Sequence, residues 1–254
     1  DRLEKRTADV FLISEDVKAK LREAFTYWDG KTVNEIASQL MPAESLEAHN
    51  DVVYTVGNYF YNGVGHISAN YEKVLNVGIN AIKQAEDKLA TLDFADGEQL
   101  NQMHFLNSVI TANKAVIAFA NRFADLAEKM ASACEEPTRR IELNEIARIC
   151  RKVPAQPAEN FQEALQAFWF VHLVIQIESN GHSISPMRFD QYMNPFLQKD
   201  DISIEQAQEM LDMLWIKFAE LNKVRDENST MAFAGYPMFM NLIVGGQKRD
   251  GSDA

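Results

Sequence analysis

Cysteine is scarce in this sequence, and long apolar runs and secretion signals are absent. Its two cysteines, Cys134 and Cys150, are too few for a disulfide framework and fit a reducing compartment. The most apolar segment, residues 164–177, is interrupted by polar side chains. It is shorter than the roughly 20 residues that a membrane helix needs, so we expect a buried helix there. The first residues are charged and no apolar stretch follows them, so we expect no signal peptide.

Basic residues are also in the minority. The chain has 37 acidic and 25 basic residues, a formal net charge of -12, and no dense run of lysine and arginine reverses that sign locally. A negative field repels phosphate backbones and anionic lipid headgroups, which argues against nucleic-acid and membrane partners. Hydrophobic residues make up 46% and charged residues 24%, a composition typical of a globular protein with a sizeable core.

Several motifs that identify common cofactor and catalytic sites are missing. The sequence has no glycine-rich phosphate loop, no Cys-x-x-Cys, no His-Glu-x-x-His and no Gly-x-Ser-x-Gly nucleophile elbow. Because no standard metal-ligand spacing occurs, we expect no metal site. Cys134 and Cys150 fall on helical patterns without a neighbouring base, so both are interpreted as structural.

Helical patterns make up most of the sequence. Helices are expected over residues 16–25, 32–40, 71–89, 98–133, 137–150, 159–177 and 203–224. Ser14, Thr32 and Ser203 stand where an N-cap residue would accept a hydrogen bond from the helix. In the longest pattern an apolar residue recurs every three or four positions, which predicts one buried stripe. The members of that stripe are Phe105, Val109, Ala112, Val116, Phe119, Phe123 and Leu126.

Strand and loop patterns occupy the rest. Residues 238–244 are apolar and Gly245-Gly246 follows them, which predicts a buried strand. Residues 52–66 show no helical period and predict a strand or loop. Residues 179–186 form a polar, turn-rich loop directly after the most apolar helix, a position where rigid folds often place chemistry.

Two of the five histidines differ from the others. His66 and His182 each follow a glycine in a loop, where an imidazole can approach a ligand with little hindrance from the preceding backbone. Histidine is the usual proton donor near neutral pH, and on this ground alone functional and structural roles are equally open for both. His104 and His172 lie in helical patterns and are expected to be packed or on the surface, and His49 is expected to be solvated.

Two other polar groups are interpreted as structural. Arg188, Asp190 and Tyr192 follow the polar loop, and we expect an ion pair between this group and a helix face. Residues 223–227 form a run of charge, which predicts a solvated helix end.

Five blocks of the sequence resemble segments of the glycyl-radical enzymes, the pyruvate formate-lyase-like family. They occur in the order that is found in that family and cover nearly the whole chain. The blocks are Tyr27-Trp28-Asp29-Gly30-Lys31-Thr32; Tyr59-Phe60-Tyr61-Asn62-Gly63-Val64-Gly65-His66, followed by Tyr71-Glu72-Lys73-Val74-Leu75; Ile177-Glu178-Ser179-Asn180-Gly181-His182-Ser183-Ile184-Ser185-Pro186, followed by Arg188-Phe189-Asp190-Gln191-Tyr192-Met193; Asn222-Lys223-Val224-Arg225-Asp226; and Asn241-Leu242-Ile243-Val244-Gly245-Gly246.

The resemblance implies a helix-dominated α/β fold, the N-terminal portion of a ten-stranded α/β barrel. Residues 1–254 are therefore expected to be an incomplete part of a pyruvate formate-lyase-like domain. In this family a glycyl radical on a C-terminal loop generates a thiyl radical on a cysteine at the centre of the barrel. A separate radical-SAM iron–sulfur activase installs the glycyl radical, and most members are dimers. The resemblance also implies anaerobic metabolism in the cytoplasm, with a bacterial microcompartment as an alternative location.

Four positions favour the cobalamin-independent glycerol and propane-1,2-diol dehydratase branch. In those enzymes an Asn, a His and a His-Ser pair line the substrate pocket, and the matching residues here are Asn58, His66, His182 and Ser183. Hydroxyproline dehydratases remain an alternative, but they carry Phe at the position of Asn58 and Asp at the position of Ser183. Choline lyases carry Asp at the position of His66.

The resemblance assigns a role to each of these side chains. The thiyl radical would abstract hydrogen from the carbinol carbon, and deprotonation of the ketyl radical would help to expel the neighbouring hydroxyl as water. His66 is the candidate proton donor to that leaving group. Asn58, His182 and Ser183 would hold the substrate hydroxyls and orient the C–O bond. The product would be an aldehyde, and no metal is needed.

The sequence lacks the two motifs that would carry the radicals. Neither Cys134 nor Cys150 follows a glycine, as the family's Gly-Cys-x-Glu motif requires, and the Arg-Val-x-Gly-Tyr loop is absent. The chain alone is therefore expected to bind no cofactor and to be inactive. A truncated gene product, or a non-catalytic helical module that binds a polyol or a partner chain, is the alternative from another class. Apolar faces such as residues 168–171 are expected to be uncovered, which predicts poor solubility.

Overall fold

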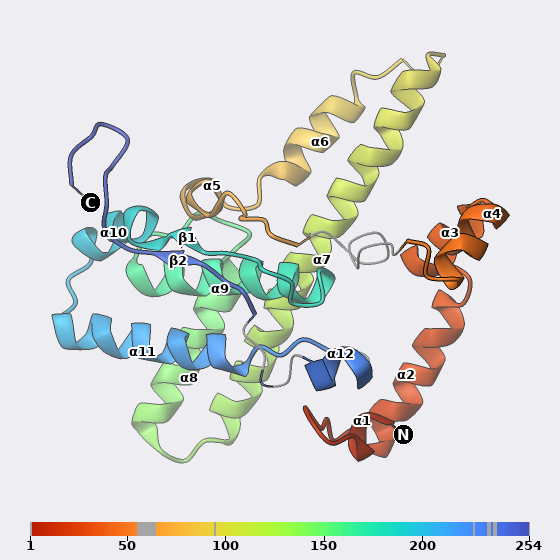
Figure 1. The fold of residues 1–254 in the computed structure, drawn as a ribbon. Helices are drawn as coiled ribbons and strands as arrows, with labels where there is room; N and C mark the ends of the chain where they lie inside the picture. The colour runs from red at the N-terminus through yellow and green to blue at the C-terminus, as the bar shows by residue number, and fades with distance from the viewer. Residues whose placement is uncertain are drawn as a thin grey trace. The chain divides into compact units, whose positions relative to one another are not determined.

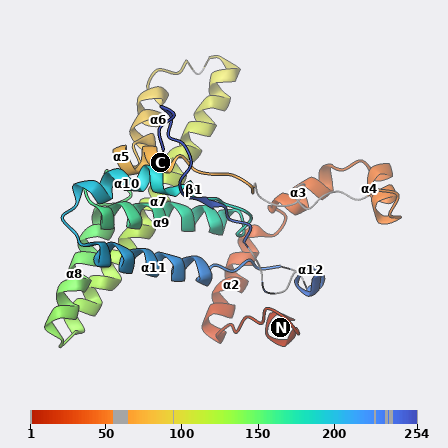
Figure 2. The same ribbon diagram turned by 60° about the vertical axis from the view of Figure 1, so that its left-hand side comes forward.

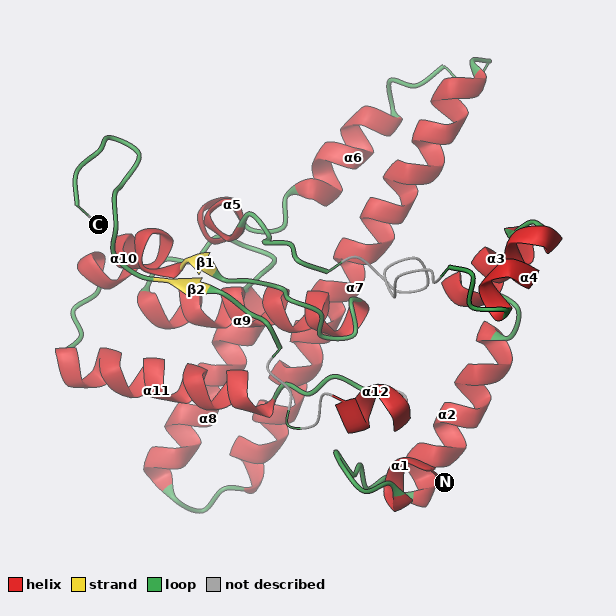
Figure 3. Cartoon of the chain, viewed as in Figure 1, coloured by secondary structure: helices red, strands yellow, loops and turns green. Residues whose placement is uncertain are grey.

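The computed structural model describes residues 2–54, 65–93, 95–225, 227–232, 235 and 238–253, and helices dominate it (Figure 1, Figure 3). The chain divides into two compact units whose segments alternate along the sequence. The first unit comprises Asp1–Ile67, Gln176–Ile184 and Leu221–Met240. The second unit comprises Ser68–Ile175, Ser185–Glu220 and Asn241–Ala254.

Short helices make up most of the first unit. They are α1 (Arg2–Lys5), α2 (Glu15–Trp28), α3 (Val33–Leu40), α4 (Ala43–Asn50) and α12 (Glu227–Ala232). Thr32 caps α3 as predicted: its hydroxyl accepts a hydrogen bond from the Glu35 amide, and the Glu35 carboxylate accepts one from the Thr32 amide. The cap predicted at Ser14 is wrong, because Ser14 precedes α2 but its hydroxyl binds the Asp16 carboxylate and caps no amide.

The second unit contains the longer helices and the sheet. Its elements are α5 (Tyr71–Val77), α6 (Ala81–Leu89), α7 (Gly97–Ala133), α8 (Pro137–Lys152), α9 (Phe161–Glu178, whose last turn belongs to the first unit), β1 (Met187–Arg188), α10 (Phe189–Lys199), α11 (Ile204–Glu220) and β2 (Leu242–Ile243). Ser203 caps α11 as predicted, since its hydroxyl accepts a hydrogen bond from the Gln206 amide over 3.2 Å. Figure 2 shows α9 and α11 side by side.

The core of the second unit is built around α9. Phe168 is 0% exposed, and its ring contacts Tyr71 of α5, Phe189 of α10 and Phe218 of α11 at centroid distances of 4.7, 5.3 and 6.1 Å. Aromatic pairs at such separations add to the free energy gained by burial. The expectation that residues 168–171 would be uncovered is wrong, because all four side chains are buried or half-buried: Phe168, Trp169 and Val171 pack in this core, and Phe170 packs against α7 and α8.

The helix predicted over residues 71–89 is two helices, α5 and α6, so the single helix was wrong. Gly78 ends α5 with a φ of 66°, in the left-handed region that favours glycine. A Cβ at Gly78 would stand 2.6 Å from the carbonyl oxygen of Ala155. The break therefore serves a close approach to another part of the chain, which the helical period could not predict.

The helix α7 is confirmed, but the stripe predicted on it is wrong. Phe105 and Leu126 are 67% and 52% exposed. The buried residues of α7 are Ala120, Ala124, Ala127 and Ala131. Two of these alanines share an apolar cluster with Cys150 of α8 and Phe170 of α9. Small side chains mark the packed face because they let the neighbouring helices approach closely.

The sheet among the described residues consists of β1 and β2, which pair in parallel with Met187 opposite Leu242. The connection between them runs through α10, α11 and α12. The strand expected over residues 238–244 is confirmed only at Leu242–Ile243, and Ile243 is 40% exposed rather than buried. The sequence missed α10, and α11 ends at Glu220 instead of 224. The ten-stranded barrel stays a prediction.

Arg188, Asp190 and Tyr192 bind main-chain atoms, so the ion pair predicted for them is wrong. The Arg188 guanidinium donates to the Gln247 carbonyl over 2.8 Å, and the Asp190 carboxylate accepts from the Gly245 amide over 2.6 Å. The Tyr192 hydroxyl donates to a main-chain carbonyl that precedes β1 over 3.0 Å. The first two bonds fasten the segment after β2 to β1 and α10, and the third fastens α10 to the loop before β1, which are structural roles.

Candidate active site

The structure brings His66 and His182 into direct contact although 116 residues separate them. Their Nε2 atoms are 3.2 Å apart, and the rings meet edge to face at 78° with centroids 4.9 Å apart. The His66 amide also donates to the His182 carbonyl over 3.1 Å, and Ile67 and Ile184 form a parallel bridge beside it. The two loop histidines that the sequence singled out therefore lie at one site in the first unit.

Two glycines allow the loops of this site to come so close. A Cβ at Gly65 would stand 2.4 Å from the His182 carbonyl oxygen and 2.5 Å from Cδ2 of its ring. Gly181 has a φ of 68°, and a Cβ there would stand 2.2 Å from Cε of Met238. A side chain at Gly65 would therefore collide with the main chain and ring of His182, and the positive φ of Gly181 is one that favours glycine.

Lys223 is the third polar residue of the site. Its Nζ lies 2.6 Å from Nδ1 of His182, and the residue is only 8% exposed. Asn180 holds the lysine segment in place, because its side-chain amide donates to the Val224 carbonyl over 2.8 Å and its oxygen accepts from the Val224 amide over 3.2 Å. The prediction that residues 223–227 form a solvated helix end is wrong, since α11 ends earlier and Lys223 is buried.

Ser183 is 1% exposed, and its backbone has a φ of 55°. Its amide donates to the Met238 carbonyl over 3.0 Å, whereas its hydroxyl has no hydrogen-bond partner among the described residues. Leaving a buried hydroxyl unsatisfied costs about 1–3 kcal/mol, so a ligand hydroxyl that supplied the missing bond would be favoured. Asn58 lies outside the described residues, and its place in the pocket stays a prediction.

Burial lowers the pKa of His182, and the charges of Lys223, His66 and Arg225 lower it further. His182 is therefore a neutral imidazole at neutral pH. Burial also lowers the pKa of Lys223, with a smaller contribution from the positive charge of Arg225. The site thus combines neutral imidazole with an amine of weakened basicity, which suits hydrogen bonding and proton transfer.

The remaining histidines lie outside this cluster. His172 is 0% exposed in the second unit, its Nδ1 lies 2.9 Å from the Tyr71 hydroxyl, and burial lowers its pKa to about 4, so the prediction of a packed histidine is confirmed. His104 is exposed on α7, which confirms the surface alternative. His49 is half-buried with its ring 6.0 Å from that of Tyr54, so the prediction that it is solvated is wrong.

Cys150 is buried, which raises the pKa of its thiol to about 11 and fits the structural role predicted for it. Cys134 is half-buried at the end of α7, and its structural role stays a prediction. Within the part of the chain that the structure describes, no group of three or more His, Cys, Asp or Glu side chains could hold a metal ion. Nor does any helix in these described residues have the length and apolar character to cross a bilayer.

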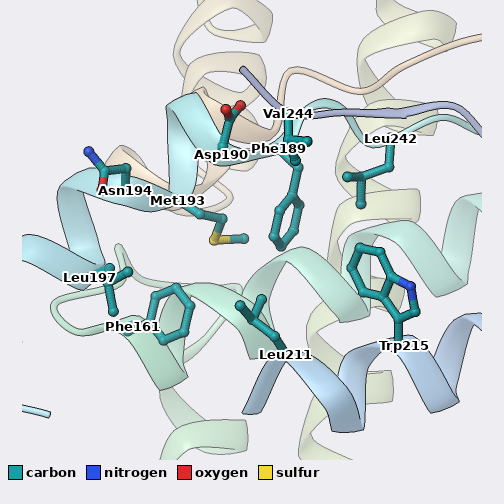
Figure 4. Close-up of a pocket in the computed structure, with 10 residues that line it drawn as sticks. All are labelled: Phe161, Phe189, Asp190, Met193, Asn194, Leu197, Leu211, Trp215, Leu242 and Val244. Carbon is teal, nitrogen blue, oxygen red and sulfur yellow. The ribbon is translucent and has the colours of Figure 1, made fainter. Parts of the chain in front are cut away.

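An apolar cavity of about 220 Å³ lies in the second unit (Figure 4). Its lining residues are Phe161, Phe189, Asp190, Met193, Asn194, Leu197, Leu211, Trp215, Leu242 and Val244. Figure 4 shows the Asp190 carboxylate turned away from the apolar centre, where it binds the Gly245 amide. None of the residues that the sequence proposed for catalysis lines this cavity, and it offers no group for proton transfer.

Sequence reasoning missed Lys223 as a member of the site. The lysine lies 41 residues beyond His182, and its charged neighbours match an ordinary helix end. The family block Asn222-Lys223-Val224-Arg225-Asp226 was the available signal, although a resemblance alone gives no contact. Asn180 and the two glycines stood within the blocks as well, but their positioning roles follow only from the folded structure.

Comparison with known proteins identifies the family. The family model described as "Pyruvate formate lyase-like" matches residues 1–254. The B12-independent glycerol dehydratase from Clostridium butyricum, solved with glycerol bound, is 52% identical with a TM-score of 0.88, and the match covers 100% of this chain and 33% of that one. A structure of 1,2-propanediol dehydration in Roseburia inulinivorans is 48% identical with a TM-score of 0.88, covering 100% of this chain and 31% of that one.

Among curated proteins, the probable dehydratase YbiW of Escherichia coli (strain K12) is 32% identical over 253 residues, which covers 97% of this chain and 31% of YbiW. The chain thus spans about a third of the length of the relatives it matches. Because the family match runs over every residue, the chain belongs to the pyruvate formate lyase-like family of glycyl-radical enzymes.

Proposed function

We propose that the protein to which this chain belongs is a glycyl-radical dehydratase that eliminates water from glycerol or propane-1,2-diol to give an aldehyde. This chain would supply part of the wall of the substrate pocket. The chain is 52% identical to a glycerol dehydratase and 48% identical to an enzyme of 1,2-propanediol dehydration. Both identities exceed the 32% identity to YbiW, which supports glycerol or propane-1,2-diol as the substrate class.

The observation that carries the proposal is the contact between His66 and His182, which are 3.2 Å apart at Nε2. The buried Ser183 hydroxyl, which has no partner among the described residues, follows His182 directly in the chain. A substrate hydroxyl can donate to or accept from each of these groups, and a small diol carries two hydroxyls.

The chemistry divides the work between this chain and residues outside it. The glycyl and thiyl radicals, which open the reaction by removing hydrogen from the carbinol carbon, require motifs that these 254 residues do not contain. His66 would protonate the departing hydroxyl, which lowers the barrier to C–O cleavage. His182, Ser183 and Asn58 would hold the hydroxyls so that the leaving bond lies along the radical orbital.

Ser183 favours a diol over hydroxyproline, the alternative substrate. Hydroxyproline carries an ammonium and a carboxylate, and the resemblance gives hydroxyproline dehydratases an Asp at the position of Ser183 and a Phe at the position of Asn58. A neutral hydroxyl at that position offers a hydrogen bond but no counter-charge for an ammonium group. An uncharged diol needs only the hydrogen bond.

The same proposal extends to the partners and the location of the protein. A radical-SAM iron–sulfur activase would install the glycyl radical, a homodimer would be the working assembly, and the cytoplasm or a bacterial microcompartment would be the location. The chain by itself, without the radical motifs, would be inactive.

The test uses the full-length protein, activated anaerobically by its radical-SAM partner. We expect a glycyl radical in the electron paramagnetic resonance spectrum, and turnover of glycerol or propane-1,2-diol to an aldehyde. His66→Gln should keep the radical while kcat falls roughly 10²-fold or more, as expected when a general acid is removed. His104→Gln, on the exposed side of α7, is the matched control and should behave as wild type.

Three outcomes would overturn the proposal. Turnover of trans-4-hydroxyproline without diol turnover would reassign the substrate. A wild type that forms no glycyl radical would favour a non-catalytic module. Wild-type kcat in His66→Gln would remove His66 from the chemistry.

A further inference from the structure

We propose that Lys223 is the proton source for His66 and acts through His182, so that the three side chains form a proton relay to the leaving hydroxyl. The inference deepens the proposed function and rests on it, because it takes His66 as the general acid. Lys223 is a positioning residue in this scheme, since it acts on the substrate only through the two imidazoles.

The geometry of the cluster supports a relay because two hydrogen bonds join the three side chains in a line. Nζ of Lys223 lies 2.6 Å from Nδ1 of His182, and Nε2 of His182 lies 3.2 Å from Nε2 of His66. The lysine uses one nitrogen of the His182 ring and His66 uses the other. His182 can therefore receive a proton on one side and release a different proton on the other.

The surroundings of Lys223 are those of an amine that can give up its proton. The residue is 8% exposed, and its hydrogen bond among the described residues goes to His182, not to a carboxylate. A buried lysine with a purely structural role is usually paired with a carboxylate, which would hold its proton. Burial and the nearby charge of Arg225 both lower the pKa of Lys223 instead.

The direction of both hydrogen bonds follows from the charge on Lys223. An ammonium group can only donate, so Nδ1 of His182 accepts and the proton of the neutral ring is on Nε2. That Nε2–H group then donates to Nε2 of His66, which leaves the His66 proton on Nδ1. The relay starts from this arrangement of hydrogen bonds, with the positive charge of the ammonium group on Lys223.

The protons along this line balance with solvent as the source that resupplies Lys223 and as the acceptor of the proton that the ketyl hydroxyl loses. His66 gives its Nδ1 proton to the departing hydroxyl, which leaves as water, and its Nε2 takes the proton from His182. Nδ1 of His182 takes a proton from Lys223, which becomes a neutral amine. At the end both rings are again neutral, with their protons on the opposite nitrogens. Solvent protons then recharge Lys223 and restore the starting tautomers.

The loop that carries Asn180 and His182 is fastened to the segment of Lys223 by hydrogen bonds of its own. A chance contact between Lys223 and His182 would not need such an anchor. Asn180, two residues before His182, makes hydrogen bonds of 2.8 and 3.2 Å with the carbonyl and amide of Val224, the residue after Lys223. The two segments are therefore tied by a main-chain anchor directly beside the Lys223–His182 bond. A side chain placed this firmly loses little entropy when it forms the hydrogen bond.

The test compares three variants of the full-length, activated enzyme. Lys223→Met removes the proton and keeps the apolar stem, and we expect kcat to fall roughly 10²-fold while KM changes less than about threefold. Lys223→Arg keeps a charged donor that does not release its proton, and it should lose kcat as well. If Lys223 only orients His182, Lys223→Arg should recover most of the rate. The matched control is Lys217→Met on α11, where the lysine is half-exposed and paired with Glu220.

A proton inventory of kcat in mixtures of light and heavy water gives a second readout. Several protons in flight predict a curved plot for wild type, and the plot should become linear in Lys223→Met. The melting temperature and the radical content show whether each variant is folded. If neither lysine variant folds, the wild-type inventory decides alone, because a linear plot overturns the relay.

The two proposals fail in different ways. Wild-type kcat in Lys223→Met, with diol turnover intact, would overturn the relay and leave the proposed function standing. A wild type that does not turn over diols would overturn the substrate assignment. The relay is then tested by the same variants on the substrate that the enzyme accepts.

Discussion

Replacing Gly65 with alanine should separate the two histidines of the site. The new Cβ would stand 2.4 Å from the His182 carbonyl oxygen, whereas ordinary contact begins at 3.4 Å, so the loops must move apart by the difference of about 1 Å. The hydrogen bond from the His66 amide to that oxygen, now 3.1 Å, would then be lost. Overpacking costs about 1–3 kcal/mol and the lost bond about 0.5–1.5 kcal/mol. A 1 Å displacement of a catalytic group lowers the rate by roughly 10²-fold.

The assay for Gly65→Ala is kcat/KM of the activated full-length enzyme, with its melting temperature and radical content measured in parallel. Gly97→Ala is the matched control, because a Cβ at Gly97 meets nothing within 4 Å at the start of α7. Alanine there should leave activity unchanged and raise stability by about 0.5–1 kcal/mol. If Gly65→Ala kept wild-type kcat/KM, the close approach of the two loops would not position the site, and the reasoning would be refuted.

Two further predictions concern stability. Glu163 in α9 is 1% exposed and accepts hydrogen bonds from Arg148 and Lys152 over 2.9 and 2.7 Å. Glu163→Gln should therefore lower the free energy of unfolding by about 2–4 kcal/mol and lower the melting temperature. Glu142→Gln, at the exposed pair with Arg139, is the control and should leave the melting temperature nearly unchanged. Burial lowers the pKa of His172 from 6.5 to about 4, so below pH 6.5 the folded state binds fewer protons at this residue than the unfolded state does. Stability should be complete above pH 6.5 and fall by up to about 3 kcal/mol as the pH drops to 4. Between pH 6.5 and 4 the melting temperature should fall less in His172→Gln than in wild type. An equal fall in the two proteins would contradict the attribution of this pH dependence to His172.

The long helices could be predicted from the sequence because their periods repeat over many turns, as in α7, α8 and α9. The errors arise where a tertiary contact overrides the local pattern. Gly78 breaks a helical period to approach the main chain of Ala155, and the fully buried residues of α7 are alanines rather than its large apolar residues. The sequence missed α10 because it holds Pro195 in its interior, where proline removes a backbone donor and normally stops a helix.

The candidate site was predictable only in part, for a related reason. His66 and His182 could be singled out because each follows a glycine in a polar loop. Nothing local predicts that Lys223 is buried, since the sign of its charge and its neighbours are those of a solvated helix end. Its position depends on the pairing of Asn180 with Val224, which joins segments 44 residues apart. A pattern that extends over a few turns does not encode contacts at that separation.

The backbone conformation of the site gives an independent reason to treat it as functional. Seven residues other than glycine have a positive φ in the described part of the chain, and three of them, His66, Asn180 and Ser183, belong to this cluster. Each such residue costs of order 1 kcal/mol, and folding alone gives no reason to place three of them together. The cost is offset only if these conformations achieve something else. Here they aim two imidazoles at each other, turn Asn180 to its main-chain anchor and bury the Ser183 hydroxyl. A glycine at any of the three positions would relieve the strain, so selection for stability alone would favour glycine where the histidine, asparagine and serine side chains now stand.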